Sequence, residues 1–412
     1  MEGGSMGFTA LTGKVRGEVE RIGSIDFIVG ISSFNNEDTI AHVLGTAAQG
    51  LVRFFPDGRH LIIVSDGGST DGTREVASRL KLPRGIERVV GRYAGVPGKG
   101  SAVKMILEAA ELLGARGVAL VDSDLRSILP DWIELLLTPL DEGGGLVTPY
   151  YLRYKYDGFI TNQIAYPFTR AVYGRNIRQP IGGEFGLSQG LVKELLKSPL
   201  WGNPYTPRFG IDIFITHTAI AHGFPVAEAF LGAKIHGAKD PTKHLAPMFR
   251  QVVGSMFSAM TLYESFWRGV KGCERVPLIR GCFEPPRPEP FPVDEEIPLK
   301  AFREGFKDFQ DLYRRVLSED LYQELYTIAH KEDFTFPTDL WAKTVYSFAA
   351  AFKGEGDKDT LLDALRICWC GRVGCFIQET RELGDEEAEE RVVEEAAVFE
   401  ELRNYLLEIY PG

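Results

Sequence analysis

The stretch Val118–Ile128 (VALVDSDLRSI) most constrains what this chain can fold into. A short apolar run ends there in two acids spaced one apart, Asp122 and Asp124. Such a run is typical of a buried strand whose carboxyl end delivers carboxylates to a cleft. Mg²⁺ prefers oxygen ligands and is commonly held by one or two carboxylates together with substrate phosphates. The stretch therefore indicates a nucleotide-diphosphate site, although an Asp-x-Asp pair by itself is more often a strand followed by a polar turn.

Segments with strand character and segments with helix character alternate around this stretch. Earlier strands are expected in SIDFIVGISSF (24–34), in Leu61–Val64 and at the start of IERVVGRYAGVPGKG (86–100), each followed by a helix. This rhythm predicts a mostly parallel sheet covered by helices on both faces. After residue 145 the pattern changes to a strand (146–154), a Gly-containing loop with a short strand (178–188) and a long helix (246–270).

The same pattern predicts how the chain is divided. We expect an N-terminal leader (1–24), an α/β domain (25–260) and a mainly helical domain (261–412). The Pro-rich segment 276–298 is expected to be a surface connector without regular structure.

Composition argues against several classes of function. A formal net charge of −11 over 412 residues is opposite to the basic excess of a general nucleic-acid binder. No apolar run approaches the roughly 18–20 residues of a membrane span, and no signal peptide is evident. The five cysteines, an odd number, favour reduced thiols. Three of them (Cys368, Cys370, Cys375) match no paired zinc spacing, so burial is favoured over a metal cluster. We expect a soluble, cytoplasmic homo-oligomer that binds neither nucleic acid nor membranes.

Three further residues narrow the interpretation of the Asp-x-Asp pair. Asp66 ends an expected strand before the loop GGSTDGT, where a carboxylate suits a nucleobase N–H or a helix cap equally well. Lys99 lies among the glycines of VPGKGS before a helix, where an ammonium and a flexible backbone suit a diphosphate, although the segment is not a Walker A motif. His236 closes AFLGAKIHG, and its imidazole is able to complete a Mg²⁺ or Mn²⁺ shell, although a lone histidine is more often structural.

In this order the residues resemble the GT-A glycosyltransferases, which use nucleotide-diphospho-sugar donors and a divalent metal on the Asp-x-Asp motif. The segments QPIGGEFGLS, FGIDIF and KIHG are similar to the group of mannosylglycerate synthase, glucosylglycerate synthase and glucosyl-3-phosphoglycerate synthase. PGKG, DSDL, GGE, GID and the terminal His occur in the family's order. The resemblance implies a Rossmann-like GT-A fold with a mainly helical C-terminal domain, and hexosyl transfer with retention.

The resemblance also implies roles for individual residues. Donor contacts are expected at Ser32, Asn36, Glu37, Asp66, Lys99 and Asp122. A divalent metal, Mg²⁺ or Mn²⁺, is expected on Asp124 and His236, and catalytic contacts at Asp122, Glu184 and Asp212. The segment ISSFNNE departs from the family pattern, which has Pro at the end of the first strand and an acid four residues later, so donor contacts there are expected to shift to Glu37.

The segment LRYKYDGFITNQ bears on the acceptor. Arg153, Asp157 and Thr161 are spaced four apart, which on a helix places them on one face. Mannosylglycerate synthase is similar in binding its small carboxylate acceptor with Arg, Asp and Thr at this spacing, and an Arg fork pairs well with a carboxylate. The phosphoglycerate-using relatives carry an Arg two residues before the Thr, where this sequence has Phe159. We therefore expect D-glycerate as the acceptor, with Asp212 as a further ligand or, alternatively, a helix cap.

The expected product is glucosylglycerate, a compatible solute or its precursor. Glucose is favoured over mannose because GAKDPTKH, after His236, does not match the mannose-using enzyme. The alternatives are a mannosylglycerate synthase using GDP-mannose and a glucosyl-3-phosphoglycerate synthase. A non-catalytic nucleotide-sugar binding protein is the alternative from a different class. A sugar nucleotidyltransferase is disfavoured because ISSFNNED lacks the Arg and Lys of an activation loop, and a polyprenyl-phosphate sugar transferase because no membrane segment is evident.

Overall fold

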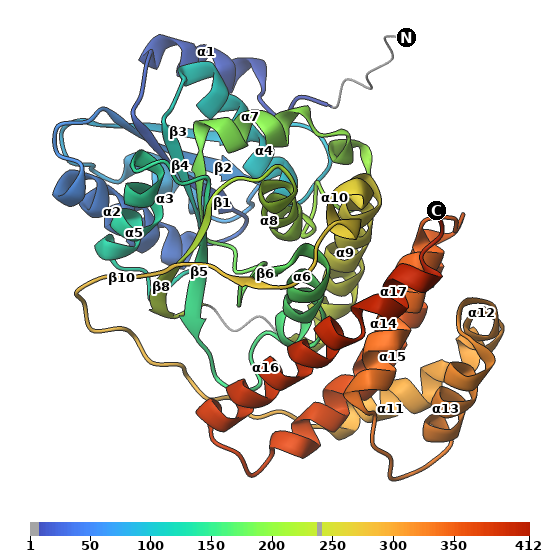
Figure 1. The fold of residues 1–412 in the computed structure, drawn as a ribbon. Helices are drawn as coiled ribbons and strands as arrows, with labels where there is room; N and C mark the ends of the chain where they lie inside the picture. Colours follow the sequence, from blue (N-terminus) through green and yellow to red (C-terminus); the bar gives the residue numbers. More distant parts are fainter. Residues whose placement is uncertain (1–7, 237–240) are drawn as a thin grey trace, which may run out of the picture. The chain divides into compact units, whose positions relative to one another are not determined.

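The computed structural model describes residues 8–236 and 241–412 (Figure 1). The chain forms two compact units that interleave along the sequence. The α/β unit comprises Met1–Leu152, Gln179–Lys239 and Val276–Pro288. The helical unit comprises Arg153–Arg178, Asp240–Arg275 and Glu289–Gly412. These boundaries differ from the expected division near residue 260, because the chain leaves the sheet after Leu152 and returns to it after Arg178.

An eight-stranded sheet, counted over the described residues, forms the centre of the α/β unit in the order β10-β8-β5-β7-β4-β1-β2-β3. Neighbouring strands are parallel except where β7 pairs with β4 and β5. The strands are β1 (Phe27–Ser33), β2 (His60–Asp66), β3 (Ile86–Arg92), β4 (Gly117–Asp122), β5 (Leu146–Leu152), β7 (Phe185–Ser188), β8 (Val226–Ala233) and β10 (Leu278–Arg280). The predicted α/β class with a mostly parallel sheet is confirmed.

Two groups of helices cover this sheet. One contains α2 (Glu37–Phe54), α3 (Thr73–Arg79) and α5 (Pro130–Asp141), and the other α1 (Gly13–Ile22), α4 (Lys99–Leu113), α7 (Gln189–Lys197) and α8 (Ile211–Ala221). In β1, Val29 and Ile31 belong to the core that contains α2 and α5, whereas Gly30 lies against Ile106 of α4. Alternate positions of a strand point to opposite faces, so a central strand covered on both faces is apolar throughout.

Two elements lie where the sequence indicates no regular structure. Helix α1 occupies the expected leader, and Thr12 caps it by accepting a hydrogen bond from the Val15 N–H at 3.4 Å. Strand β10 lies in the Pro-rich segment and pairs with β8, Leu278 opposite Glu228. The expectation of an irregular connector over 276–298 is therefore wrong for residues 278–280, and also for 296–298, where helix α11 (Glu296–Gly305) begins. Prolines are tolerated around β10 because an edge strand has a partner on one side only.

The helical unit contains helix α15, Lys358–Thr380, which is buried around most of its circumference. The unit's other elements are a π-helical turn (Thr161–Ala165), α6 (Tyr166–Tyr173), β6 (Arg175–Asn176), α9 (Pro241–Leu262), α10 (Glu264–Arg268), β9 (Glu274–Arg275), α11 (Glu296–Gly305), two short 3-10 and α segments (Phe306–Phe309 and α12, Gln310–Val316), α13 (Glu319–Ala329), α14 (Thr338–Phe352), α16 (Asp385–Glu401) and α17 (Arg403–Ile409). The single long helix expected at 246–270 is interrupted at Tyr263, between α9 and α10. Among the helices of the described residues, none combines the length and apolar character that a membrane span requires.

Two features inside the helical unit concern its chemistry. The three clustered cysteines of α15 are buried, as expected. Arg372 is also fully buried in α15, where Nη1 donates to Glu379 Oε1 at 2.7 Å and Nη2 forms an ion pair with Glu395. Burial raises the pKa of Glu379, but the hydrogen bond and charge of Arg372 outweigh it and lower the pKa below its ordinary value.

Candidate functional site

Five charged side chains of the α/β unit meet at the carboxyl edge of its sheet. Asp122 is the last residue of β4, and Lys234 directly follows β8. Lys99 is the first residue of α4, Asp212 lies in the first turn of α8, and Glu184 directly precedes β7. Because neighbouring parallel strands end at the same edge, residues far apart in sequence converge here.

Asp122 pairs with both lysines. Its Oδ1 lies 2.9 Å from Lys99 Nζ, and its Oδ2 lies 2.7 Å from Lys234 Nζ. Lys99 Nζ also lies 3.2 Å from Asp212 Oδ2. Burial raises the pKa of Asp122, but the two ammoniums more than offset this and hold the pKa well below its ordinary value. Burial lowers the pKa of each lysine, and the carboxylates reverse this and raise it. Two positive charges are therefore present at neutral pH.

Glu184 lies behind Lys234 and is fully buried. Its Oε2 is 2.9 Å from Lys234 Nζ and accepts a hydrogen bond from the Tyr151 hydroxyl, while Oε1 accepts from the Asp122 N–H at 3.3 Å. Burial raises the pKa of Glu184, and the charge of Lys234 opposes this. These contacts make Glu184 a partner of Lys234, and its expected place near the sugar stays a prediction.

The glycine pair before Glu184 has a steric explanation. Gly183 has a φ of +98°, in the region that favours glycine. A Cβ at this position would lie 2.8 Å from Asp122 Oδ2, 2.8 Å from Lys234 Nζ and 3.2 Å from Lys99 Nζ. The charged cluster therefore packs directly on the Gly183 backbone.

The glycines around Lys99 also serve close packing. A Cβ at Gly100 would collide with the Thr206 carbonyl oxygen. The Gly100 N–H donates to the Arg208 carbonyl at 3.0 Å, and the Ser101 N–H donates to the Pro207 carbonyl at 2.9 Å. The expectation that the backbone here suits a diphosphate is therefore wrong for these two amides, since a neighbouring chain segment already accepts their hydrogen bonds.

The two predicted metal ligands are brought together by the backbone. Leu125, next to Asp124, forms an isolated antiparallel bridge with His236. The Arg126 N–H donates to the Ile235 carbonyl at 2.7 Å, which extends this pairing. Among the described residues, no group of three or more His, Cys, Asp or Glu side chains forms a metal site. A carboxylate and an imidazole fit a Mg²⁺ or Mn²⁺ ion whose remaining ligands come from phosphate and water.

Asp66 is fully buried at the end of β2. Its Oδ1 accepts from the Gly68 and Ser69 N–H groups, both at 2.9 Å, and its Oδ2 accepts from Ser33 Oγ at 3.3 Å. These contacts shape the Gly-rich loop, whichever role Asp66 has toward a nucleobase.

The other predicted donor residues follow β1. Ser32 lies in β1 opposite Asp122 of β4. Asn36 Oδ1 accepts from Ser123 Oγ at 2.7 Å, next to Asp122. Glu37 Oε2 accepts from the Gly72 N–H at 3.0 Å. The Glu37 carboxylate thus stabilises the loop after β2.

In the helical unit, the three predicted acceptor residues surround Gly158. A Cβ at Gly158 would lie 3.6 Å from both Arg153 Nη1 and Thr161 Oγ1. Arg153 Nη1 donates to Asp157 Oδ2 at 2.7 Å. The expectation that one helix face carries them is wrong for Arg153 and Asp157, which lie in a turn ending at Gly158 with a φ of +80°. The turn brings the three side chains together without a helix.

Phe159, in the position where an Arg would indicate a phosphorylated acceptor, faces an apolar cluster of the helical unit. It packs against the core formed by Tyr166, Phe376, Val392 and Ala396. Its ring centroid lies 6.5 Å from that of Phe376. Packing therefore favours a hydrophobic side chain at this partly buried position.

Lys234 and Tyr151 have no role in the predictions from sequence. Lys234 lies two residues before His236, so the period of an extended chain would have placed both on the same side. Tyr151 carries no comparable signal, because its contact with Glu184 joins segments 33 residues apart. The segment GAKDPTKH, which bears on glucose against mannose, begins at 237–240, outside the described residues.

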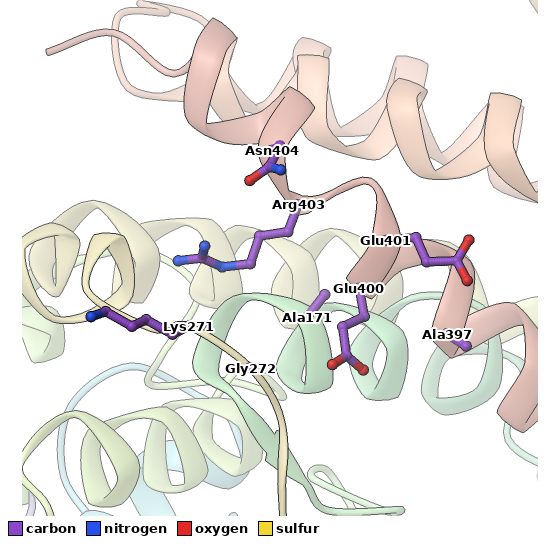
Figure 2. A pocket seen from close by; sticks show the side chains of 8 residues that line it. All are labelled: Ala171, Lys271, Gly272, Ala397, Glu400, Glu401, Arg403 and Asn404. Carbon is purple, nitrogen blue, oxygen red and sulfur yellow. The ribbon is translucent and has the colours of Figure 1, made fainter.

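A separate hollow of about 460 Å³ lies in the helical unit (Figure 2). Its lining contains two cations, Lys271 and Arg403, and two acids, Glu400 and Glu401. None of the predicted site residues lines it, and its mixed charges favour no single class of ligand.

The sequence is similar to a known protein family and to several solved structures. Residues 28–196 match the family described as Glycosyl transferase family 2. The match runs from β1 into α7, which is less than half of the chain. The match includes Asp66, Lys99, Asp122 and Asp124, and it confirms the expected GT-A glycosyltransferase. No relative is found among curated proteins.

The chain is also similar to solved structures of glucosyl-3-phosphoglycerate synthase from Mycobacterium tuberculosis. A complex with Mn²⁺, UDP and phosphoglyceric acid is 28% identical, covers 59% of this chain and 81% of that chain, and has a TM-score of 0.47. A complex with Mn²⁺, UDP and glucosyl-3-phosphoglycerate is 27% identical, with 60% and 85% covered and a TM-score of 0.46. A complex with Mg²⁺ and UDP is 27% identical, with 59% and 82% covered and a TM-score of 0.46.

Proposed function

We propose that the protein transfers a hexose, preferably glucose, from a nucleotide-diphospho-sugar to D-glycerate with retention of anomeric configuration. The observation that carries the choice of acceptor is the arrangement around Gly158. Arg153, Asp157 and Thr161 converge there, while Phe159 faces an apolar core. A guanidinium suits the glycerate carboxylate, and the Asp and Thr oxygens suit its hydroxyls.

The donor diphosphate is assigned to the charged cluster of the α/β unit. Lys99 and Lys234 are both protonated, and both pair with Asp122. When a diphosphate binds here, its oxygens replace carboxylate oxygens as hydrogen-bond acceptors of these two ammoniums. Asp124 and His236 would hold a divalent metal, with diphosphate oxygens completing its coordination. When bound, this metal supplies Lewis-acid stabilisation of the departing phosphate.

Transfer with retention is assigned to a front-face displacement. A glycerate hydroxyl attacks the anomeric carbon from the side on which the nucleoside diphosphate departs. The bond between the anomeric carbon and the phosphate oxygen breaks, and the hydroxyl proton passes to that oxygen. Lys99 and Lys234 donate hydrogen bonds to the charge that develops on the leaving group. Asp212, paired with Lys99, keeps one of these ammoniums oriented.

Acceptor choice follows from the missing cation at position 159. Loss of one charge-assisted contact costs about 1.5–3 kcal/mol, which corresponds to roughly 10- to 150-fold in kcat/KM. We therefore expect D-glycerate to be used about that much more efficiently than 3-phosphoglycerate. Steady-state rates with both acceptors measure this directly, and a preference for 3-phosphoglycerate would contradict the assignment.

One panel of reactions tests the proposal as a whole. The purified full chain is incubated with ADP-, GDP- or UDP-glucose or GDP-mannose, D-glycerate and Mg²⁺, and the product is identified by mass and NMR. The expected product is an α-linked glucosylglycerate from an α-linked donor. A β-linked product would overturn retention, and a mannosylated product would overturn the preference for glucose.

A substitution separates an enzyme from a binding protein. Asp124→Ala is expected to abolish transfer, because it removes one of two proposed metal ligands. The matched control is Asp57→Ala, which removes an exposed acid from a turn of the same unit. Equal activity of both variants would remove the metal assignment.

A further inference from the structure

The turn that carries Arg153 and Asp157 is fastened to helices of its own unit by the residue between them. Lys155 Nζ donates hydrogen bonds to three backbone carbonyls, those of Thr380 at 2.9 Å, Arg381 at 2.9 Å and Leu383 at 2.7 Å. These carbonyls lie at the end of α15 and in the connection to α16. The Lys155 side chain therefore caps the carboxyl end of α15.

This arrangement is electrostatically favourable. The last carbonyls of an α-helix have no partner within the helix, and the helix dipole places partial negative charge there. An ammonium with three donors binds the Thr380 carbonyl at the end of α15 together with the Arg381 and Leu383 carbonyls of the connection that follows. The backbone N–H of Lys155 also donates to Asp385 Oδ1, in the first turn of α16, at 3.0 Å. The turn is thus held through both its side chain and its backbone.

A second set of contacts fastens the other end of the turn to α16. Asn162 Nδ2 donates to the Asp157 carbonyl at 3.2 Å. Arg178 Nη2 donates to Asn162 Oδ1 at 2.8 Å and to Glu389 Oε2 of α16 at 2.7 Å. Arg178 itself is buried. The segment from 153 to 162 therefore lies between two fixed points, and Lys155 is the one nearer to Arg153.

We propose that Lys155 is a positioning residue for the acceptor site, fixing the turn so that Arg153 and Asp157 are in place before the acceptor binds. This rests on the proposed function, in which those two residues and Thr161 bind glycerate. An irregular turn without such anchoring samples many conformations, and ordering it on binding would weaken affinity for the acceptor. The cation binds backbone carbonyls of α15 and its following turn and makes no substrate contact in this scheme.

Lys155→Met in the full chain tests this, because methionine keeps much of the apolar stem and removes the ammonium. Loss of a charge-assisted anchor is expected to raise KM for glycerate about tenfold or more, with KM for the nucleotide-sugar within about twofold. Lys155→Arg, whose guanidinium is also able to donate to the carbonyls, is expected to restore KM for glycerate to within about threefold. The matched control is Lys343→Met, which removes a lysine of the same unit that pairs with Asp339 on α14.

Amide hydrogen exchange of residues 153–162 provides a readout that needs no substrate. Faster exchange there in Lys155→Met, but not in Lys343→Met, is expected. Asp385→Asn weakens the backbone anchor and leaves the Lys155 ammonium in place, so it is expected to give the same change to a smaller extent. This second variant keeps the proposal testable if Lys155→Met fails to fold. Wild-type KM for glycerate together with wild-type exchange in Lys155→Met would overturn the proposal. If the wild-type protein transfers nothing to glycerate, the proposed function fails, and exchange alone then decides whether Lys155 holds the turn.

Discussion

Gly183→Ala adds a single methyl group at the point where the charged cluster packs on the backbone. The new Cβ would lie 2.8 Å from both Asp122 Oδ2 and Lys234 Nζ, so these atoms must move by several tenths of an ångström. The positive φ adds about 1–2 kcal/mol of backbone strain. Displacing one ammonium from its proposed contact with the donor diphosphate costs about 1.5–3 kcal/mol, which lowers kcat/KM by roughly 10- to 150-fold.

Gly143→Ala separates strain from steric displacement. Gly143 has a φ of +93°, and nothing lies within 4 Å of a Cβ built there. Both variants are expected to lose about 1–2 kcal/mol of stability in urea unfolding, from the shared backbone strain. Only Gly183→Ala is expected to lose activity, measured as nucleoside diphosphate released during transfer. Equal kcat/KM in the two variants would refute the reasoning that the cluster positions the donor.

Three other predictions follow from buried charges and thiols. Lys234→Met is expected to destabilise the protein by about 3–5 kcal/mol in urea unfolding, because it leaves Glu184 buried without its ammonium, and adding Glu184→Gln should recover part of this loss. Burial raises the pKa of the Cys368 thiol to about 12. Iodoacetamide at pH 8 is therefore expected to label exposed Cys282 before Cys368 in the native protein. Mass spectrometry of the labelled peptides measures both reactions, and equal labelling of the two cysteines would contradict this expectation. The lowered pKa of Glu379 supplies stability that is present above its unfolded value of 4.5 and is lost as the pH falls through the lower folded value, so urea unfolding between pH 7 and pH 3 should show an acid-side loss that Glu379→Gln reduces.

Much of the fold is predictable because local pattern and tertiary environment agree. The strands containing Val29 and Val121 are apolar on both faces, which is the pattern of a central strand in a covered sheet. The convergence of Lys99 and Asp122 also follows from the sequence. In a parallel sheet the ends of the strands, and the starts of the helices that follow them, all lie at one edge. Strand β10 is less predictable, because three residues among prolines carry too short a pattern.

The details of the site depend on contacts between distant segments. Lys234 gains its role from Glu184 and Asp122, which are 50 and 112 residues away. The sequence predicts that the amides at the start of α4 are able to bind phosphate. In the structure the Gly100 and Ser101 amides instead donate to the carbonyls of Arg208 and Pro207. The spacing of Arg153 and Asp157 fits a helix, yet the glycine that follows allows a turn that achieves the same convergence. Spacing alone does not distinguish these two solutions.

The interleaving of the two units has a consequence for how the chain is made. Helix α6, early in the chain, packs against α16, which begins more than 200 residues later at Asp385. At ribosomal rates of about 5–20 residues per second, roughly 10–40 seconds pass between the synthesis of α6 and that of α16. Residue Tyr166 of α6, which belongs to one buried cluster with Val392 and Ala396 of α16, lacks that contact during synthesis. The helical unit therefore completes its core only after α16 has been synthesised, and chains that terminate before α16 expose a surface that favours aggregation.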